Sequence, residues 1–237
     1  MNKIYMLFKQ FRMLDAVKIS FVEIFRKIFD KYRVASYSQA GDDCIIDFYL
    51  NGKSKIIYVD IGCNMPFQFS NTMKFYQRGS TGLAVDANPE VIKQYSKYRP
   101  NDISICACVS NSKGKSVLFV PEHSAMGSIS NEFKSQYMSD GVKEFLVENI
   151  SGNELFEKYA IPDKFDLLSV DVEGHDFSVL QSINFHKYRP FIIIVEMHKI
   201  MDFKDLFETE IFKYLKNYSY KLVAFSSMNA FFLDQNV

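Results

Sequence analysis

Three carboxylic acids and a histidine follow a single apolar segment within six positions of the sequence. Asp171, Glu173, His175 and Asp176 come directly after the apolar run 165–170. Carboxylates placed this close together repel one another unless a cation or a substrate offsets their charge. We therefore expect Asp171 to project into a functional site, and we predict that Asp176 is the N-cap of a following helix. His175 is either a general base or a solvated loop residue.

A glutamate and a histidine close another apolar segment further along the chain. Glu196 and His198 follow the run 191–195 and alternate, so a strand would place them on one face. If this strand neighbours the one before Asp171, then Asp171, Glu196 and His198 form a group of oxygen and imidazole ligands suited to Mg²⁺ or Mn²⁺. Without a metal, the two carboxylates would orient a substrate. We predict His198, His175 and Asp171 as the candidate catalytic residues.

The turn after the first predicted strand contains one glycine where a dinucleotide site normally has three. Asp60 lies near the end of the strand, Gly62 and Asn64 follow it, and Pro66 stands where a further glycine would be needed. This spacing is poorly suited to a pyrophosphate. A single glycine beside a strand-end aspartate instead suits a ligand without phosphates, such as the methionine part and sulfonium of S-adenosylmethionine.

An aspartate at the end of the next predicted strand is placed to bind a ribose. Asp86 closes the apolar run 82–86, and a carboxylate there can accept hydrogen bonds from both ribose hydroxyls. Either a nicotinamide dinucleotide or S-adenosylmethionine would satisfy this residue, and the turn at Gly62 favours the second. The alternative is that Asp86 only caps the helix that begins at Pro89.

The elements that carry these residues alternate between apolar strands and helices. Continuous apolar strands interleaved with helices indicate an α/β fold with a parallel sheet covered on both faces. Ligands in such sheets bind beyond the carboxyl ends of the strands, where the strand order reverses. The run 220–233 predicts a C-terminal antiparallel hairpin. The other predicted strands cover 55–61, 82–86, 103–109, 165–170 and 191–196, and the predicted helices cover 70–79, 89–98, 176–183 and 203–217.

Two segments stand apart from this alternation. Residues 1–35 are predicted to form an amphipathic helical extension, because apolar residues recur in it at intervals of three and four. Residues 1–33 carry a net charge of +5, which the remainder of the chain balances. The extension would pack on the main domain, contact a second copy of the chain, or lie on an anionic membrane. Residues 121–160 are polar, with helical patches near 131–138 and 153–160, so we expect an insertion or lid over the site.

The composition excludes several classes of protein. Of the 237 residues, 48% are apolar and 16% aromatic, which is incompatible with a disordered chain. Lys and Arg together number 28, as do Asp and Glu, and this zero net charge argues against a general nucleic-acid binder. The four cysteines form no C-x-x-C pair, so we expect free thiols in a reducing cytoplasm. We expect neither a transmembrane helix nor a secretory signal, because charged residues interrupt every long apolar run.

A series of motifs runs from Tyr37 to His198. They are Ser38-Gln39-x-Gly41-Asp42-Asp43, Tyr58-Val59-Asp60-Ile61-Gly62-x-Asn64, Ser70-Asn71-Thr72, Asp86-x-Asn88-Pro89, Asp166-Leu167-Leu168-Ser169-Val170-Asp171-Val172-Glu173-Gly174-His175, Arg189-Pro190 and Glu196. In these motifs the sequence resembles the FkbM family of S-adenosylmethionine-dependent methyltransferases. The D-x-E-G-H segment, coupled to the later R-P and strand-end glutamate, is the more specific part, whereas many methyltransferases share the D-I-G-x-N turn.

The resemblance implies a Rossmann-like, seven-stranded methyltransferase sheet over residues 36–237, with helices on both faces. It also implies that S-adenosylmethionine is the cofactor. The first turn would hold its methionine part, and the acidic end of the second strand would hold its ribose. By this resemblance the cofactor-binding residues are Gln39, Asp60, Gly62, Asn64, Asn71, Asp86 and Ala87.

The same resemblance implies O-methylation, often of sugars or polyketide-like products. We predict a methyltransferase that acts on a sugar hydroxyl, in a nucleotide-linked or polymer saccharide of bacterial capsule or lipopolysaccharide biosynthesis. A nucleotide-linked sugar would need a basic pocket, for which Lys113, Lys115 and Arg78 are available. The alternatives are an enzyme that methylates a lipid or small-molecule natural product at the inner face of the membrane, a non-catalytic cofactor-binding scaffold, and an NAD-dependent oxidoreductase.

Overall fold

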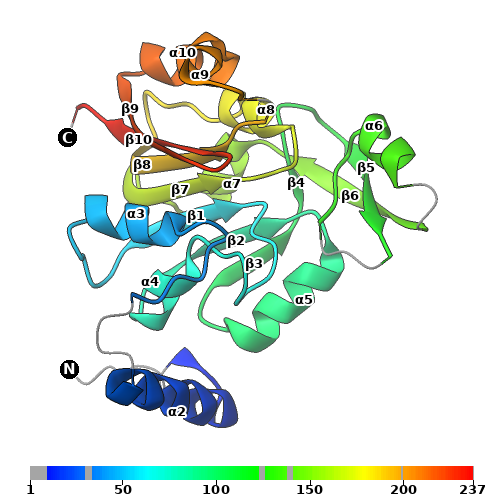
Figure 1. The fold of residues 1–237 in the computed structure, drawn as a ribbon. Helices are drawn as coiled ribbons and strands as arrows, with labels where there is room; N and C mark the ends of the chain where they lie inside the picture. The colour runs from blue at the N-terminus through cyan, green and yellow to red at the C-terminus, as the bar shows by residue number, and fades with distance from the viewer. Residues whose placement is uncertain (1–9, 30–33, 123–125, 138–140, 199, 237) are drawn as a thin grey trace.

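A sheet of seven strands forms the centre of the molecule (Figure 1). The computed structural model describes residues 10–29, 34–122, 126–137, 141–198 and 200–236. The order of the strands across the sheet is β3-β2-β1-β7-β8-β10-β9. In that order, the strands span Ile103–Cys106, Thr81–Asp86, Ile57–Ile61, Lys164–Val170, Arg189–Glu196, Asn229–Asp234 and Tyr220–Ser226.

The sheet is parallel except at one edge. β1 pairs in parallel with β2 on one side and with β7 on the other, so the strand order reverses between β1 and β7. β3 and β8 extend the parallel part, while β10 runs antiparallel to both β8 and β9. The predicted sheet, mostly parallel with a C-terminal antiparallel hairpin, is therefore confirmed. Its ligand-binding edge is expected at the ends of β1, β2 and β7.

Helices cover both faces of the sheet (Figure 1). Alternate residues of each strand enter two different cores: Val59 packs with one set of helices and Tyr58 with the other. The first core contains residues of α7, α8, α9 and α10, and the second contains residues of α3 and α4, with α5 covering the neighbouring strand. The helices span Asp42–Tyr49 (α3), Met73–Gln77 (α4), Pro89–Tyr98 (α5), Gly152–Lys158 (α7), Asp176–Gln181 (α8), Phe203–Glu208 (α9) and Glu210–Asn217 (α10).

Two predicted elements are divided in the structure. The strand expected over 103–109 ends at Cys106, and β4 (Cys108–Val109) belongs to a different sheet. The helix expected over 203–217 is interrupted at Thr209, whose backbone is extended and whose hydroxyl accepts a hydrogen bond from the amide of Phe212. This threonine therefore caps a new helix, α10, because its side chain satisfies an amide that the first turn leaves unpaired.

The segment between β4 and β7 forms a second, smaller sheet. β5 (Lys115–Pro121) and β6 (Val142–Ile150) pair in antiparallel fashion, and β4 joins the outer side of β6. Our prediction of only helical patches over 121–160 is wrong, because β6 lies within it. Most side chains of β6 are exposed or half-buried, so its sequence lacks the apolar run that marks a buried strand. The helix α6 (Asn131–Gln136) lies between the two strands in sequence.

A long helix, α2 (Met13–Phe29), lies outside these layers next to α4 (Figure 1). It is attached through Phe11 and Ala16, which pack against Met73 and Tyr76. The remainder of the predicted extension at 1–9 and 30–33 is outside the described residues. No helix in the described part of the chain combines the length and apolar character needed to cross a bilayer.

Candidate functional site

The turn after β1 passes directly against the turn after β7. The amide of Asp171 donates to the carbonyl of Ile61 (2.9 Å), and Gly62 has a φ of +78°. A Cβ atom built on Gly62 would lie 1.6 Å from the carbonyl oxygen of Asp171. Only glycine fits this contact, because any side chain would collide with backbone atoms. The glycine selected from the sequence thus joins two strand ends, and it lines the hollow beside them.

Asp60 lies in β1 and is held by a buried polar network. Its Oδ2 accepts a hydrogen bond from Thr72 Oγ1 (2.8 Å), and that hydroxyl accepts two hydrogen bonds from Arg99 (3.0 Å each). Arg99 is fully buried and paired with Asp102 at 2.7 Å. Burial raises the pKa of Asp60, and the contacts with Thr72 and Arg99 oppose this rise. Sequence reasoning did not identify Arg99, because an arginine near a helix end carries no sign of burial.

Asp86, at the end of β2, orders the backbone around the first two turns. Its Oδ2 accepts a hydrogen bond from the amide of Asn64 (3.0 Å), and its Oδ1 accepts one from the amide of Asn88 (2.8 Å). The residue that caps α5 is Asn88, whose side chain accepts from the amide of Glu90 (2.9 Å). The alternative role of Asp86 as that helix cap is therefore not observed. Burial raises the pKa of Asp86 to about 6.

A hollow lies at these strand ends. Polar groups and apolar side chains both line it, as is typical of small-molecule sites. One buried oxygen in it, Asn64 Oδ1, has no hydrogen-bond partner among the described residues. The residues lining this hollow, which we call the cofactor hollow, include Gly62, Asn64, Asp86, Ala87, Ala107, Val109, Leu118, Asp171 and His175.

A second hollow adjoins the cofactor hollow and shares Gly62 and Asn64 with it. Gln39 and Asn71 line this second hollow, and Asn71 Nδ2 donates to Ser169 Oγ (3.2 Å). The structure therefore gathers all seven residues proposed for the cofactor around two connected hollows, although they come from four separate parts of the chain. Their individual roles toward the cofactor stay predictions.

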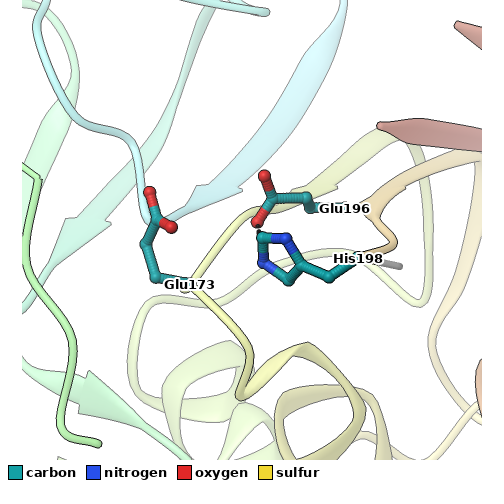
Figure 2. A group of neighbouring side chains, drawn as sticks. All are labelled: Glu173, Glu196 and His198. Atoms are coloured by element: carbon teal, nitrogen blue, oxygen red, sulfur yellow. Dashed lines mark ion pairs between the residues drawn. The ribbon is translucent and has the colours of Figure 1, made fainter. Parts of the chain in front are cut away.

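An acid and imidazole group borders the second hollow (Figure 2). One ligand atom each of Glu173, Glu196 and His198 lies within 4.8 Å of the others. His198 Nε2 lies 2.8 Å from Glu196 Oε2. The two atoms are at ion-pair distance, but this buried oxygen has no hydrogen-bond partner in the described part of the chain. A buried carboxylate oxygen in this condition is unusual, and it points into a group that has metal-ligand chemistry.

Glu173 takes the place that the sequence suggested for Asp171 in this group. It has a positive φ of 54°, which is uncommon for a residue with a side chain. Burial, then the nearby charge of Glu196, raises its pKa to about 7. The pKa of Asp171 is raised well above its usual range by burial and by Glu196, to which its carboxyl is hydrogen-bonded. Asp171 therefore adjoins the group through Glu196 without being one of its three members.

The segment after Glu173 differs from its predicted form at the helix start. His175 occupies the N-cap position of α8, and Asp176 is the first residue of the helix. The carboxylate of Asp176 accepts hydrogen bonds from the amides of Val172 (3.0 Å) and Gly174 (3.2 Å), so it folds the loop instead of capping the helix. His175 lines the cofactor hollow, and burial lowers its pKa.

A groove continues from the acid and imidazole group toward α6. Its walls include Glu173, Glu196 and His198 on one side and two rings of α6 and its C-cap, Phe133 and Tyr137, on the other. The ring centroids of this aromatic pair are 4.8 Å apart. His175 also lines the groove. The insertion thus contributes side chains beside the ends of the strands, where the sequence predicted a lid.

The basic residues considered for a phosphate-bearing substrate are engaged elsewhere. Arg78 forms hydrogen bonds to both carboxylate oxygens of Asp47, and Lys115 pairs with Glu148 at 2.6 Å. Neither of them, nor Lys113, lines the cofactor hollow, the second hollow or the groove. The described residues of all three spaces include several carboxylates and no lysine or arginine.

The chain is similar to known proteins in sequence and in structure. A family model described as "Methyltransferase FkbM domain" matches residues 60–222. Among solved structures, the chain is similar to a TehB-like SAM-dependent methyltransferase from Corynebacterium glutamicum ATCC 13032 Kitasato. That pair shares 11% sequence identity with a TM-score of 0.44, and the alignment covers 93% of this chain and 100% of the other. No curated protein matches the chain significantly.

Proposed function

We propose, because this chain belongs to the FkbM family of methyltransferases, that the enzyme transfers the methyl group of S-adenosylmethionine to a hydroxyl group of a saccharide. One observation carries the proposal: the cofactor hollow is continuous, through shared residues, with an acid and imidazole group and with a groove that has an aromatic wall. Such a groove suits an acceptor that is polar at its hydroxyls and apolar on its ring faces. We place the reaction in the cytoplasm and in capsule or lipopolysaccharide biosynthesis.

The residues of the cofactor hollow fit S-adenosylmethionine by their hydrogen-bonding chemistry. The unpartnered Asn64 Oδ1 would accept from the ammonium of the methionine part, and Asp60 would add negative charge behind it. A carboxylate has about four acceptor positions, so Asp86 keeps acceptors for two ribose hydroxyls beyond its two backbone contacts. Val109 and Leu118 offer an apolar surface for the adenine. When bound, S-adenosylmethionine supplies an electrophilic methyl carbon.

His175 is our candidate for the general base. Its ring lines both the cofactor hollow and the groove, and its lowered pKa keeps it neutral near physiological pH. A neutral imidazole can take the proton that a hydroxyl loses as it attacks the methyl group. Burial, then the charge of Glu196, raises the pKa of Asp171, and its carboxyl is hydrogen-bonded to Glu196, so we do not assign it the role of base.

Glu173, Glu196 and His198 would hold a divalent cation such as Mg²⁺ or Mn²⁺. Glu196 Oε2 is buried, lies 2.8 Å from His198 Nε2 and accepts no hydrogen bond among the described residues, which favours this assignment over a purely structural acidic cluster. A cation there would lower the pKa of a coordinated hydroxyl and offset the charge of the carboxylates. The acidic lining would repel the negative charge of a diphosphate. It therefore favours an uncharged saccharide as the acceptor over a diphosphate-linked one.

Replacing Glu196 with glutamine is expected to weaken Mn²⁺ binding by at least about tenfold. Loss of a residue that only hydrogen-bonds to a metal ligand already costs about this much affinity, and loss of a ligand should cost no less. Titration of the full-length protein with MnCl₂, followed by electron paramagnetic resonance, measures the affinity. Glu132→Gln is the matched control, because Glu132 lines the same groove outside the three-residue group. The cation site is wrong if the unmodified protein binds no Mn²⁺, or if Glu196→Gln binds it equally well.

Methyl transfer to a saccharide hydroxyl predicts a specific, chemically stable product. We expect label from S-adenosylmethionine carrying a radioactive methyl group to enter polysaccharide in an alkali-stable form, because a methyl ether resists base and a methyl ester does not. Polysaccharides, nucleotide sugars and lipid extracts are to be tested as separate acceptors. His175→Ala should lower the rate by about 10²–10⁴-fold, the usual contribution of a general base. Label confined to lipid, or released by alkali, would contradict the saccharide assignment.

A further inference from the structure

The apolar side of α2 faces away from the rest of the protein. Seven of its large apolar side chains are between 45% and 74% exposed, whereas Ile19 is half-buried against the body of the protein. Residues 14, 17, 21 and 24 are spaced by three or four positions, so they form one stripe along the helix. Figure 1 shows the helix at the periphery, with only one side toward the body. The exposed residues, which we call the α2 stripe, are Met13, Leu14, Val17, Phe21, Val22, Ile24 and Phe25.

The opposite side of the same helix is firmly attached, so this orientation is part of the fold. Ala16 is fully buried and Ser20 is 7% exposed. Gln10, three residues before the helix begins, is fixed twice: its side chain donates to the carbonyl of Ser80 (2.9 Å), and its own carbonyl accepts from Tyr76 (3.0 Å). Rotation of the helix to bury the α2 stripe would expose Ala16 and Ser20. An apolar face that a fold turns outward usually marks an interaction surface.

Charge distinguishes between the surfaces that could cover this stripe. Residues 1–33 contain eight basic and three acidic residues, and Arg12 and Lys18 are exposed in and beside α2. A second copy of the chain would bring two such positive segments together, and they would repel each other. An anionic lipid surface would attract them, and a basic helix with an apolar face lies in the plane of such a surface.

We propose that the α2 stripe docks the enzyme on an anionic membrane surface. The apolar side chains enter the boundary between headgroups and acyl chains, and the exposed cations Arg12 and Lys18 lie at the headgroups. This inference goes beyond methyl transfer and does not depend on the identity of the acceptor. It leaves the cofactor hollow unaffected, because no residue of the α2 stripe lines it.

Vesicle flotation with the full-length protein tests this docking surface. We expect the protein to float with vesicles of phosphatidylcholine containing roughly 30% phosphatidylglycerol, and to bind vesicles of phosphatidylcholine alone at least about tenfold more weakly. Salt at about 1 M should release it, because it screens the lipid charge. Phe21→Ser should weaken vesicle binding by about tenfold, because serine loses most of the apolar contact that the phenylalanine ring would make with the lipid. The control Phe48→Ser removes an equally exposed ring on α3 and should float normally.

Three results would overturn the proposal: no flotation of the unmodified protein with either vesicle, equal flotation with both, or equal flotation of Phe21→Ser. Light scattering after size-exclusion chromatography adds a separate outcome. A dimer that Phe21→Ser dissociates, while Phe48→Ser does not, would assign the stripe to a second copy of the chain and exclude lipid docking. Titration of each variant with S-adenosylmethionine verifies the fold. It also separates this proposal from the proposed function, because either can fail while the other holds.

Discussion

Gly62→Ala is expected to destabilise the folded protein by several kcal/mol and to abolish binding of S-adenosylmethionine. An alanine Cβ at this position would lie 1.6 Å from the carbonyl oxygen and 2.6 Å from the carbonyl carbon of Asp171. These are backbone atoms, so β1 and β7 would have to separate at their ends. The left-handed backbone adds about 1–2 kcal/mol for any residue other than glycine. Urea unfolding measures the stability, and calorimetric titration measures cofactor binding.

Gly41→Ala is the matched control for this substitution. Gly41 has a similar positive φ of +85°, but a Cβ there would meet no atom within 4 Å. It should therefore show the backbone penalty alone and keep its affinity for S-adenosylmethionine. A Gly62→Ala protein that never folds, while Gly41→Ala folds, is the extreme form of the expected result. Equal stability and equal cofactor affinity in the two variants would contradict the close contact between the two turns.

Asp86→Ala is expected to weaken binding of S-adenosylmethionine on the order of 100-fold or more. Hydrogen bonds to a charged group contribute about 1.5–3 kcal/mol each, and the carboxylate is placed to accept two from the ribose. Loss of its contacts with the amides of Asn64 and Asn88 would further loosen the first turn. Calorimetric titration of the variant with S-adenosylmethionine gives the affinity, and its thermal unfolding shows whether the fold is retained.

The pH dependence of the same titration provides an internal test. The pKa of Asp86 is raised to about 6 by burial. The ionised carboxylate is the form that accepts from both hydroxyls, so the affinity should be constant well above pH 6. It should fall toward tenfold per pH unit below that value, as protonation removes the acceptor. In Asp86→Asn this decline should disappear. Asn88→Ala, which removes the side-chain cap of α5, should keep both the affinity and the decline.

Local sequence patterns determined the parallel core of this protein. The runs that became β1, β7 and β8 are predominantly apolar, because both faces of these strands are covered by helices. A single glycine and two strand-end aspartates then identified the edge at which the hollows lie. The second sheet was not predicted, because its strand β6 is not covered on both faces. β6 is largely exposed, so pairing with β5 forms it without an apolar run that the sequence could reveal.

The membership of the acid and imidazole group also depended on the fold. The sequence placed Glu196 and His198 on one face, and they do lie 2.8 Å apart. The sequence predicted Asp171 as their partner in a metal site. The tight approach of Asp171 to Gly62, together with the left-handed backbone of Glu173, directs Glu173 to the group and leaves Asp171 beside it.

By itself, then, the sequence determined the fold class, the ligand-binding edge and the residue types that meet there. These follow from hydrophobic periodicity and from turn chemistry, which act between residues close together in the chain. Tertiary structure alone decided which carboxylates share a site, which arginine is buried under Asp60, and which side of α2 faces outward. Those outcomes depend on contacts between residues far apart in sequence, where burial, charge and close packing are settled together.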